Sequence, residues 1–152
     1  MELKQQLLTH LKELLGARME ASMKAMEFAQ ESANAEGKSS AGDKYETTRS
    51  MSQLDRNMHA RQYEQARQEN TILERLEATP EPGSYERVAM GSLVKTTAGY
   101  FFIAVSAGAI KIDDQTVMVV SSASPVGKSI LGKQVGDTVQ FRGKNWRIEE
   151  IG

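Results

Sequence analysis

Apolar residues in the first half of the chain recur at helical spacing. From residue 8 onward they are separated by three or four positions, which places them on one face of a helix in a pattern close to a coiled-coil heptad. One small polar residue, Ser22, stands in this stripe and fits a close contact between two helices. The stripe consists of Leu8, Leu11, Leu15, Met19, Ser22, Met26, Ala29 and Ala33.

The same spacing returns after a stretch rich in Gly and Ser, "GKSSAG" at residues 37–42. Two helices separated by such a turn fold back most simply as an antiparallel coiled coil, with a dimerising coiled coil as the alternative. A fold-back near residue 40 predicts that Leu54 lies against Met26 and Met58 against Ser22. Arms of some 30 residues would form a rod on the order of 45–50 Å long. The second stripe consists of Met51, Leu54, Met58, Ile72, Leu73 and Leu76.

The pattern changes near residue 78. The segment "EATPEPG" contains Pro80 and Pro82, which cannot continue a helix and favour extended conformations before them. We therefore expect a coiled-coil hairpin over 1–77, a linker over 78–84 and a second domain over 85–152.

The second domain shows the pattern of a small sheet with one short helix. Within "SPVGKSILG", Ser124 suits an N-cap, Pro125 a first turn and Gly132 a C-cap. A hairpin turn is expected at Arg142–Gly143, and Phe141 and Trp146 are expected in the core. The fold class is α+β, with an antiparallel sheet. The expected strands are "GSLVKT", "GYFFIAV", "QTVMVVS", "VGDTVQF" and "KNWRIEEI".

Composition excludes several classes of protein. The 19 basic and 20 acidic residues balance, and neither half of the chain is a basic arm for nucleic acid. There is no cysteine, hence no disulfide, thiol nucleophile or Cys-based zinc site. The opening "MELKQQLL" has no apolar segment behind it, and no apolar run approaches a membrane span. We expect a soluble, cytoplasmic monomer.

Residues 117–151, "VMVVSSASPVGKSILGKQVGDTVQFRGKNWRIEEI", resemble the C-terminal domain of the Gre-type bacterial transcript cleavage factors, the GreA/GreB family. The resemblance lies in the Ser124-Pro125 helix start, in "LGK" and "GD" after it, and in the closing strand rich in Ile and Glu. "GSLV" at 91–94 is similar to the family's first strand. The family also has an N-terminal antiparallel coiled coil, so the resemblance extends to the first half.

The resemblance implies a function in transcription. In Gre-type factors an FKBP-like domain docks on RNA polymerase near its secondary channel, and the coiled coil enters that channel. Acidic residues at its tip then help to hold a second Mg²⁺ and position a water, so that the polymerase hydrolyses the 3′ end of a backtracked nascent RNA. Carboxylates and water are the ligands that Mg²⁺ prefers. The protein would be an accessory factor rather than an enzyme, with no cofactor of its own.

The tip residues depart from the family pattern. The family has an Asp-x-x-Glu pair within Asp-Leu-Ser-Glu-Asn-Ala-Glu-Tyr, and this chain has Asp43-Lys44-Tyr45-Glu46. The acidic spacing is kept, so the resemblance carries the catalytic and Mg²⁺-binding roles to Asp43 and Glu46. If the tyrosines are aligned instead, Lys38 and Ala41 take the acidic positions. A capping box at the start of the helix is the structural alternative for the same pair.

Further residues are candidates for contact with RNA or polymerase. Lys44, Arg49 and Arg56 lie near the tip, where solvated helix charges are the alternative explanation. In the second domain the candidates are Asp113, Asp114, Ser124 and Pro125.

Three other functions remain open from the sequence. The first is a non-cleaving regulator that occupies the channel, and the second is a purely structural coiled-coil dimer. The third is a peptidyl-prolyl isomerase or chaperone, which would need an aromatic pocket built from Tyr100, Phe101, Phe102, Phe141 and Trp146.

Overall fold

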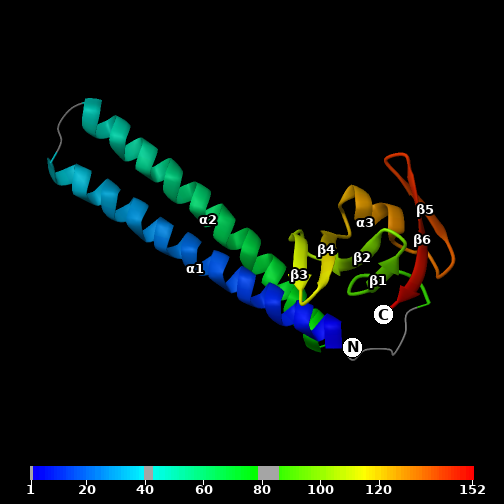
Figure 1. Cartoon of the computed structure of the whole chain (residues 1–152). Coiled ribbons are helices and arrows are strands. Elements are labelled where there is room, and N and C mark those ends of the chain that lie inside the picture. Colours follow the sequence, from blue (N-terminus) through cyan, green and yellow to red (C-terminus); the bar gives the residue numbers. More distant parts are fainter. Residues whose placement is uncertain (1, 40–42, 79–85) are drawn as a thin grey trace. The chain divides into compact units, whose positions relative to one another are not determined.

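The computed structural model describes residues 2–39, 43–78 and 86–152, and the side chains of residues 2, 33 and 35–48 lie outside the description (Figure 1). The chain divides into two compact units. One comprises Met1–Leu11 with Ile72–Gly152, and the other comprises Lys12–Thr71. Each is described by itself below.

Two long helices form the first half of the chain. Helix α1 spans Glu2–Ser39 and helix α2 spans Asp43–Ala78, and the two run in opposite directions (Figure 1). The predicted helical hairpin is therefore confirmed. At 1.5 Å per residue each helix is roughly 55 Å long, somewhat longer than the expected arms.

The stripe predicted for α1 is the stripe that the hairpin buries. Leu8, Leu11 and Leu15 are fully buried, and Ser22 is only 9% exposed. Ala29 is also buried, while Met19 and Met26 are half-buried. Because these positions follow a heptad, α1 keeps one face toward α2 along this length.

The stripe predicted for α2 is wrong in its distal part. Met51, Leu54 and Met58 are exposed instead of buried. In the last turns of α2 the prediction holds, because Leu73 is buried and Ile72 and Leu76 are half-buried. Seven of the buried and half-buried positions of α2 follow a heptad, and among them only Leu73 belongs to the predicted stripe. This observed seam consists of Ser52, Arg56, His59, Tyr63, Ala66, Asn70 and Leu73. The helix is therefore turned relative to the prediction, and its distal seam is polar.

Six strands form one sheet in the second half of the chain, in the order β3-β4-β2-β1-β6-β5. The prediction of five antiparallel strands is corrected in two respects. An additional strand, β3, precedes β4, and β4 pairs with β2 in parallel. The chain leaves β2, forms β3 at the edge and returns as β4 between them, so β4 runs in the direction of β2. The strands are β1 Leu93–Thr96, β2 Gly99–Ala104, β3 Gly108–Ile112, β4 Gln115–Ser121, β5 Thr138–Phe141 and β6 Lys144–Ile151.

The hairpin turns follow the local sequence. Arg142 and Gly143 connect β5 to β6 with φ values of 51° and 77°, as the predicted tight turn requires. The short helix α3, Pro125–Ile130, also forms where it was expected. Its C-cap is Leu131, one position earlier than the predicted Gly132, which follows with a φ of 83°.

One face of the sheet packs against α3. Phe101, Ile103 and Ile148 from the strands surround Ile130 of α3 in a buried cluster. Trp146 is half-buried at its edge and stacks on Phe101, with ring centroids 4.9 Å apart. Phe141 is also half-buried, so the two predicted core aromatics border the core instead of filling it. The opposite face also buries apolar side chains, among them Leu93, Phe102, Val117 and Val119.

Candidate functional site

The predicted catalytic pair lies at the start of the return helix. Asp43 is the first residue of α2, and Glu46 falls within its first turn. Residues three apart in a helix are neighbours on its surface, so the backbone there permits two carboxylates to act together. The side chains of Asp43, Lys44 and Glu46 lie outside the described residues. Their catalytic, Mg²⁺-binding and polymerase-binding roles stay predictions.

The two arginines near the tip differ in their surroundings. Arg49 is exposed, as expected of a solvated helix charge. Arg56 is half-buried and falls on the heptad seam of α2 described above. Only Arg49 therefore presents its side chain mainly to solvent, and contact with RNA stays a prediction for both.

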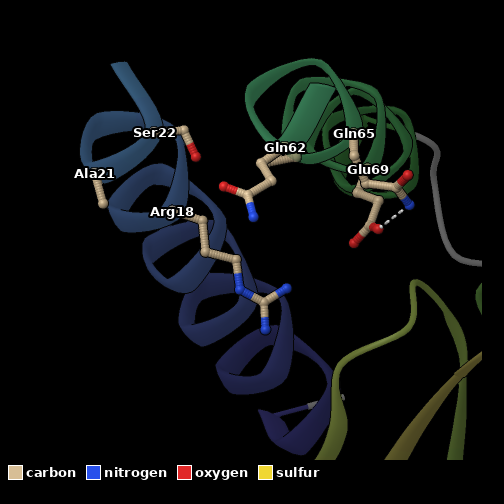
Figure 2. A pocket seen from close by; sticks show the side chains of 7 residues that line it. Arg18, Ala21, Ser22, Gln62, Gln65 and Glu69 are labelled. Atoms are coloured by element: carbon tan, nitrogen blue, oxygen red, sulfur yellow. Dashed lines mark hydrogen bonds between the residues drawn. The ribbon is translucent and has the colours of Figure 1, made fainter. Parts of the chain in front are cut away.

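A groove runs between the helices on one flank of the hairpin (Figure 2). Its volume is about 380 Å³, and small residues create it: Ala21 and Ser22 on α1 lie beside Ala66 on α2. Polar side chains complete the lining, namely Arg18, Gln62, Gln65 and Glu69.

A carboxylate forms one wall of the groove. Glu69 Oε1 accepts a hydrogen bond of 2.9 Å from Gln65 Nε2, one helical turn earlier (Figure 2). The other oxygen, Glu69 Oε2, is buried and has no hydrogen-bond partner among the described residues. A buried acceptor without a donor costs about 1–3 kcal/mol, so this wall is better satisfied when a donor enters the groove. On the opposite wall Arg18 extends from α1 into the gap between the helices.

The sequence did not reveal this groove. The predicted fold-back set Met58 against Ser22, whereas Ser22 shares the groove with Gln62, Gln65 and Ala66. The available signal was small: a serine in the stripe of α1, and an alanine in the stretch of α2 between Met58 and Ile72, where the predicted stripe has no member.

The acidic pair of the second domain forms a turn at one end of the sheet. Asp113 and Asp114 connect β3 to β4, and both are exposed. Asp113 has a φ of 54°, a left-handed conformation that Asp tolerates better than most residues. This turn is exposed to solvent, and docking of Asp113 and Asp114 on a partner stays a prediction.

Ser124 and Pro125 have a structural role in the helix start. Ser124 Oγ accepts a hydrogen bond from Gly127 N at 3.0 Å and donates one to Ser121 O at 2.7 Å. Pro125 is the first residue of α3 and is exposed. The backbone of Gly127 approaches that of Ser121 closely: a Cβ at Gly127 would lie 2.1 Å from Ser121 O. These contacts confirm the predicted cap, and a part in docking stays a prediction.

One exposed ion pair on α2 carries the pKa shifts found among the described residues. Arg67 donates hydrogen bonds to Glu64, which lowers the pKa of that carboxyl and raises the pKa of the guanidinium. Both groups are exposed, so this pair is a surface ion pair of small consequence. Among the described residues, no three His, Asp or Glu lie close enough together to hold a metal ion. No helix within the described part of the chain is long and apolar enough to cross a membrane.

Comparison with known proteins finds similar solved structures, among them the following. The crystal structure of the GreA factor homolog 1 (Gfh1) protein of Thermus thermophilus is 24% identical, covers 93% of this chain and 94% of that chain, and has a TM-score of 0.36. A structure of the transcription factor Gfh1 is 22% identical, covers 95% of this chain and 92% of that chain, and has a TM-score of 0.35. No protein-family model and no curated protein matches the chain. Because both TM-scores are below 0.5, the fold described above rests on the structure of this chain itself.

Proposed function

We propose that this protein is a Gre-type transcription factor that binds RNA polymerase through residues 85–152 and inserts its helical hairpin into the secondary channel. The observation that carries the proposal is the agreement of two independent parts in the expected order. A long helical hairpin comes first, and a small sheet domain with an α3 capped by Ser124 follows it.

The dimensions of the hairpin suit this task. A probe that reaches a buried active centre has to be narrow and long, and two helices of roughly 55 Å side by side meet both needs. The heptad seam over α1 makes such a pair stiffer than a single helix. The balanced charge of the chain favours a protein partner over bulk binding to nucleic acid.

Asp43 and Glu46 are the residues that we propose to act in cleavage. They stand at the first turn of α2, at the hairpin end where the chain reverses. Carboxylate oxygens suit Mg²⁺, but two side chains supply fewer ligands than its octahedral shell needs. The polymerase and water would therefore provide the rest, and within that shared site the ion would supply charge stabilisation for RNA hydrolysis.

A factor that occupies the channel without cleavage is the second candidate. The stretch Asp43-Lys44-Tyr45-Glu46 favours it, because it departs from the family pattern around the acidic pair and places a lysine between the acids. Such a protein would bind polymerase and regulate initiation or pausing.

The burial of the aromatic residues speaks against an isomerase. Phe102 is fully buried and Phe101 nearly so, and Trp146 stacks on Phe101. Phe101 and Trp146 stack on one face of the sheet and Phe102 is buried on the other, so these three rings do not converge on a pocket for a proline-containing peptide.

A cleavage assay on backtracked elongation complexes tests the proposal. We expect the protein to release short 3′ RNA fragments, and we expect Asp43→Asn and Glu46→Gln each to lower the cleavage rate at least tenfold. Glu64→Gln is the matched control, since Glu64 is an exposed acid on the same helix and should leave cleavage unchanged.

Binding measured in parallel separates the two candidates. Intact RNA together with co-sedimentation of protein and polymerase would establish the non-cleaving regulator. Absence of both cleavage and co-sedimentation would overturn the proposed function.

A further inference from the structure

The distal half of the hairpin exposes large apolar side chains. Phe28 on α1 is 71% exposed, and on α2 Leu54 is 67%, Met51 63% and Met58 40% exposed. We call these four residues the distal apolar patch. The neighbouring seam of α2 is polar there, and the large apolar side chains of α2 are exposed instead.

The heptad positions place the patch on one flank. Ala21 lines the groove, and Phe28 follows it seven residues later on the same face of α1. On α2, Gln65 lines the groove, and Met58 and Met51 precede it at steps of seven. The patch and the groove therefore follow one another along the same side of the hairpin.

The size of the patch indicates a binding surface. Its four side chains expose roughly 500 Å², within the range at which apolar patches on monomers are commonly functional. When the patch packs on the same patch of a second copy, both patches are buried. The total buried area is then roughly 1,000 Å², which reaches the size expected of a specific interface. The spacing of three and four residues on α2 is that of a helix-packing seam, so the surface suits another helix.

We propose that two copies of this chain pair through the distal apolar patch, with their hairpins pointing in opposite directions. In this arrangement α1 of one copy lies parallel to α2 of the other, and Phe28 packs on Met58 of the second copy. The contact is isologous, so each pairing occurs twice.

The charges around the patch fit this orientation. Lys24 and Glu31 flank Phe28 on α1, while Asp55 and Arg61 flank Met58 on α2. When α1 is parallel to the α2 of the second copy, Lys24 and Asp55 fall on the same side of the contact, one turn before Phe28 and Met58, so opposite charges meet there. In the reverse orientation like charges would meet, which is destabilising.

Met51 of the second copy reaches the part of the groove that Ala21 lines. Ala21 and Gln65 lie level in the groove, and Phe28 and Met58 lie level seven residues further along each helix toward the tip. Met51 of the second copy precedes its Met58 by seven residues, so it reaches the level of Ala21. A methionine is flexible enough to pack on the small side chain of Ala21, and this contact leaves Glu69, which lies one turn beyond Gln65, to a hydrogen-bond donor from solvent.

Pairing covers the distal flank of the hairpin. Paired copies would be unable to present a free hairpin to polymerase, so the dimer would act as a stored form; this consequence rests on the proposed function. The pairing itself does not, because it is measured without polymerase.

Sedimentation equilibrium of the full chain tests the pairing. We expect a reversible monomer–dimer equilibrium, which Phe28→Gln and Met58→Gln each weaken about tenfold or more, with unchanged helix content by circular dichroism. Val135→Gln is the control, because Val135 is an exposed apolar residue of the sheet domain and should leave the dimer intact. Lys24→Glu should weaken the dimer, and combining it with Asp55→Lys should restore it.

The absence of natural cysteines allows a test of orientation. A chain with Ala21→Cys mixed with a chain with Met51→Cys should form a disulfide between copies under mild oxidation. Ala21→Cys mixed with Val135→Cys should not. A chain that stays monomeric at all concentrations would overturn the proposal, as would a dimer that is insensitive to Phe28→Gln or that lacks the Ala21–Met51 cross-link.

Discussion

The two ends of the helical hairpin differ in the polarity of their buried and half-buried residues. Toward the chain termini, Leu11 and Leu15 of α1 and Leu73 of α2 are fully buried. Toward the tip, the half-buried heptad positions of α2 are Ser52, Arg56 and His59. The same pair of helices thus has an apolar seam at one end and a polar seam at the other.

The apolar end of the hairpin therefore contributes mainly to stability, and the polar end exposes residues that are available for recognition. Burial of apolar area dominates folding free energy, so the leucine end holds the hairpin together. A polar seam contributes less to the folding free energy. It also leaves the apolar residues of α2 exposed to solvent, where they are available to a partner. Local patterns that conflict with the fold are expected at functional surfaces.

The sharpest test compares one leucine from each end. Leu15→Ala should lower the free energy of unfolding by about 3 kcal/mol, because Leu15 is fully buried and its truncation leaves a cavity. Leu54→Ala should change it by less than about 0.5 kcal/mol, since Leu54 is mostly exposed. Urea denaturation followed by circular dichroism at low protein concentration measures both. Equal losses would show that Leu54 belongs to the seam, as the sequence alone suggested.

A second test replaces a polar residue of the α2 seam with an apolar one. Arg56→Leu should raise the stability of the hairpin by about 1 kcal/mol, because an apolar side chain gains from burial where a half-buried guanidinium has to remain hydrated. Thermal unfolding monitored by circular dichroism provides the measurement. Arg49→Leu is the control at an exposed position seven residues away, and it should give no gain. Destabilisation by Arg56→Leu would mean that the distal seam is held by polar contacts.

The smallest effect concerns a glycine within α1. Gly16 lies next to Leu15 in the leucine end, and a Cβ at this position would meet no atom within 4 Å. Gly16→Ala should therefore stabilise the protein by about 0.5–1 kcal/mol through helix propensity alone. Gly127→Ala is the contrasting control, because its Cβ would collide with the backbone of Ser121 and should destabilise the sheet domain. A loss of stability from Gly16→Ala would show that the leucine end is packed more tightly than the structure indicates.

Local signals predicted much of the fold. The capping residue Ser124 with Pro125 predicted α3, and Arg142–Gly143 predicted the turn between β5 and β6, because these residues bond or bend within a few positions of one another. The leucines of α1 predicted its buried face for the same reason. Strand β3 was missed, since "GAIKI" shows little alternation and gains its partner only from β4.

The candidate site was predictable only in part. The spacing of Asp43 and Glu46 at the start of α2 was visible in the sequence, and it carries the proposed cleavage role. The groove was not visible, because it depends on which residues of α2 stand opposite Ser22. A wrong register of a few residues replaced Ala66 with Met58 and removed the space between the helices.

The sequence by itself determined the elements of this protein: two long helices joined by a short turn, a proline-containing connection, and strands around a capped short helix. Caps, turns and periodicity act over a few residues and can therefore be read along the chain. Only the tertiary structure decided which face of α2 meets α1, and that β4 runs parallel to β2. Both depend on contacts between residues far apart in sequence, whose packing free energy can outweigh a local apolar pattern such as Met51, Leu54 and Met58.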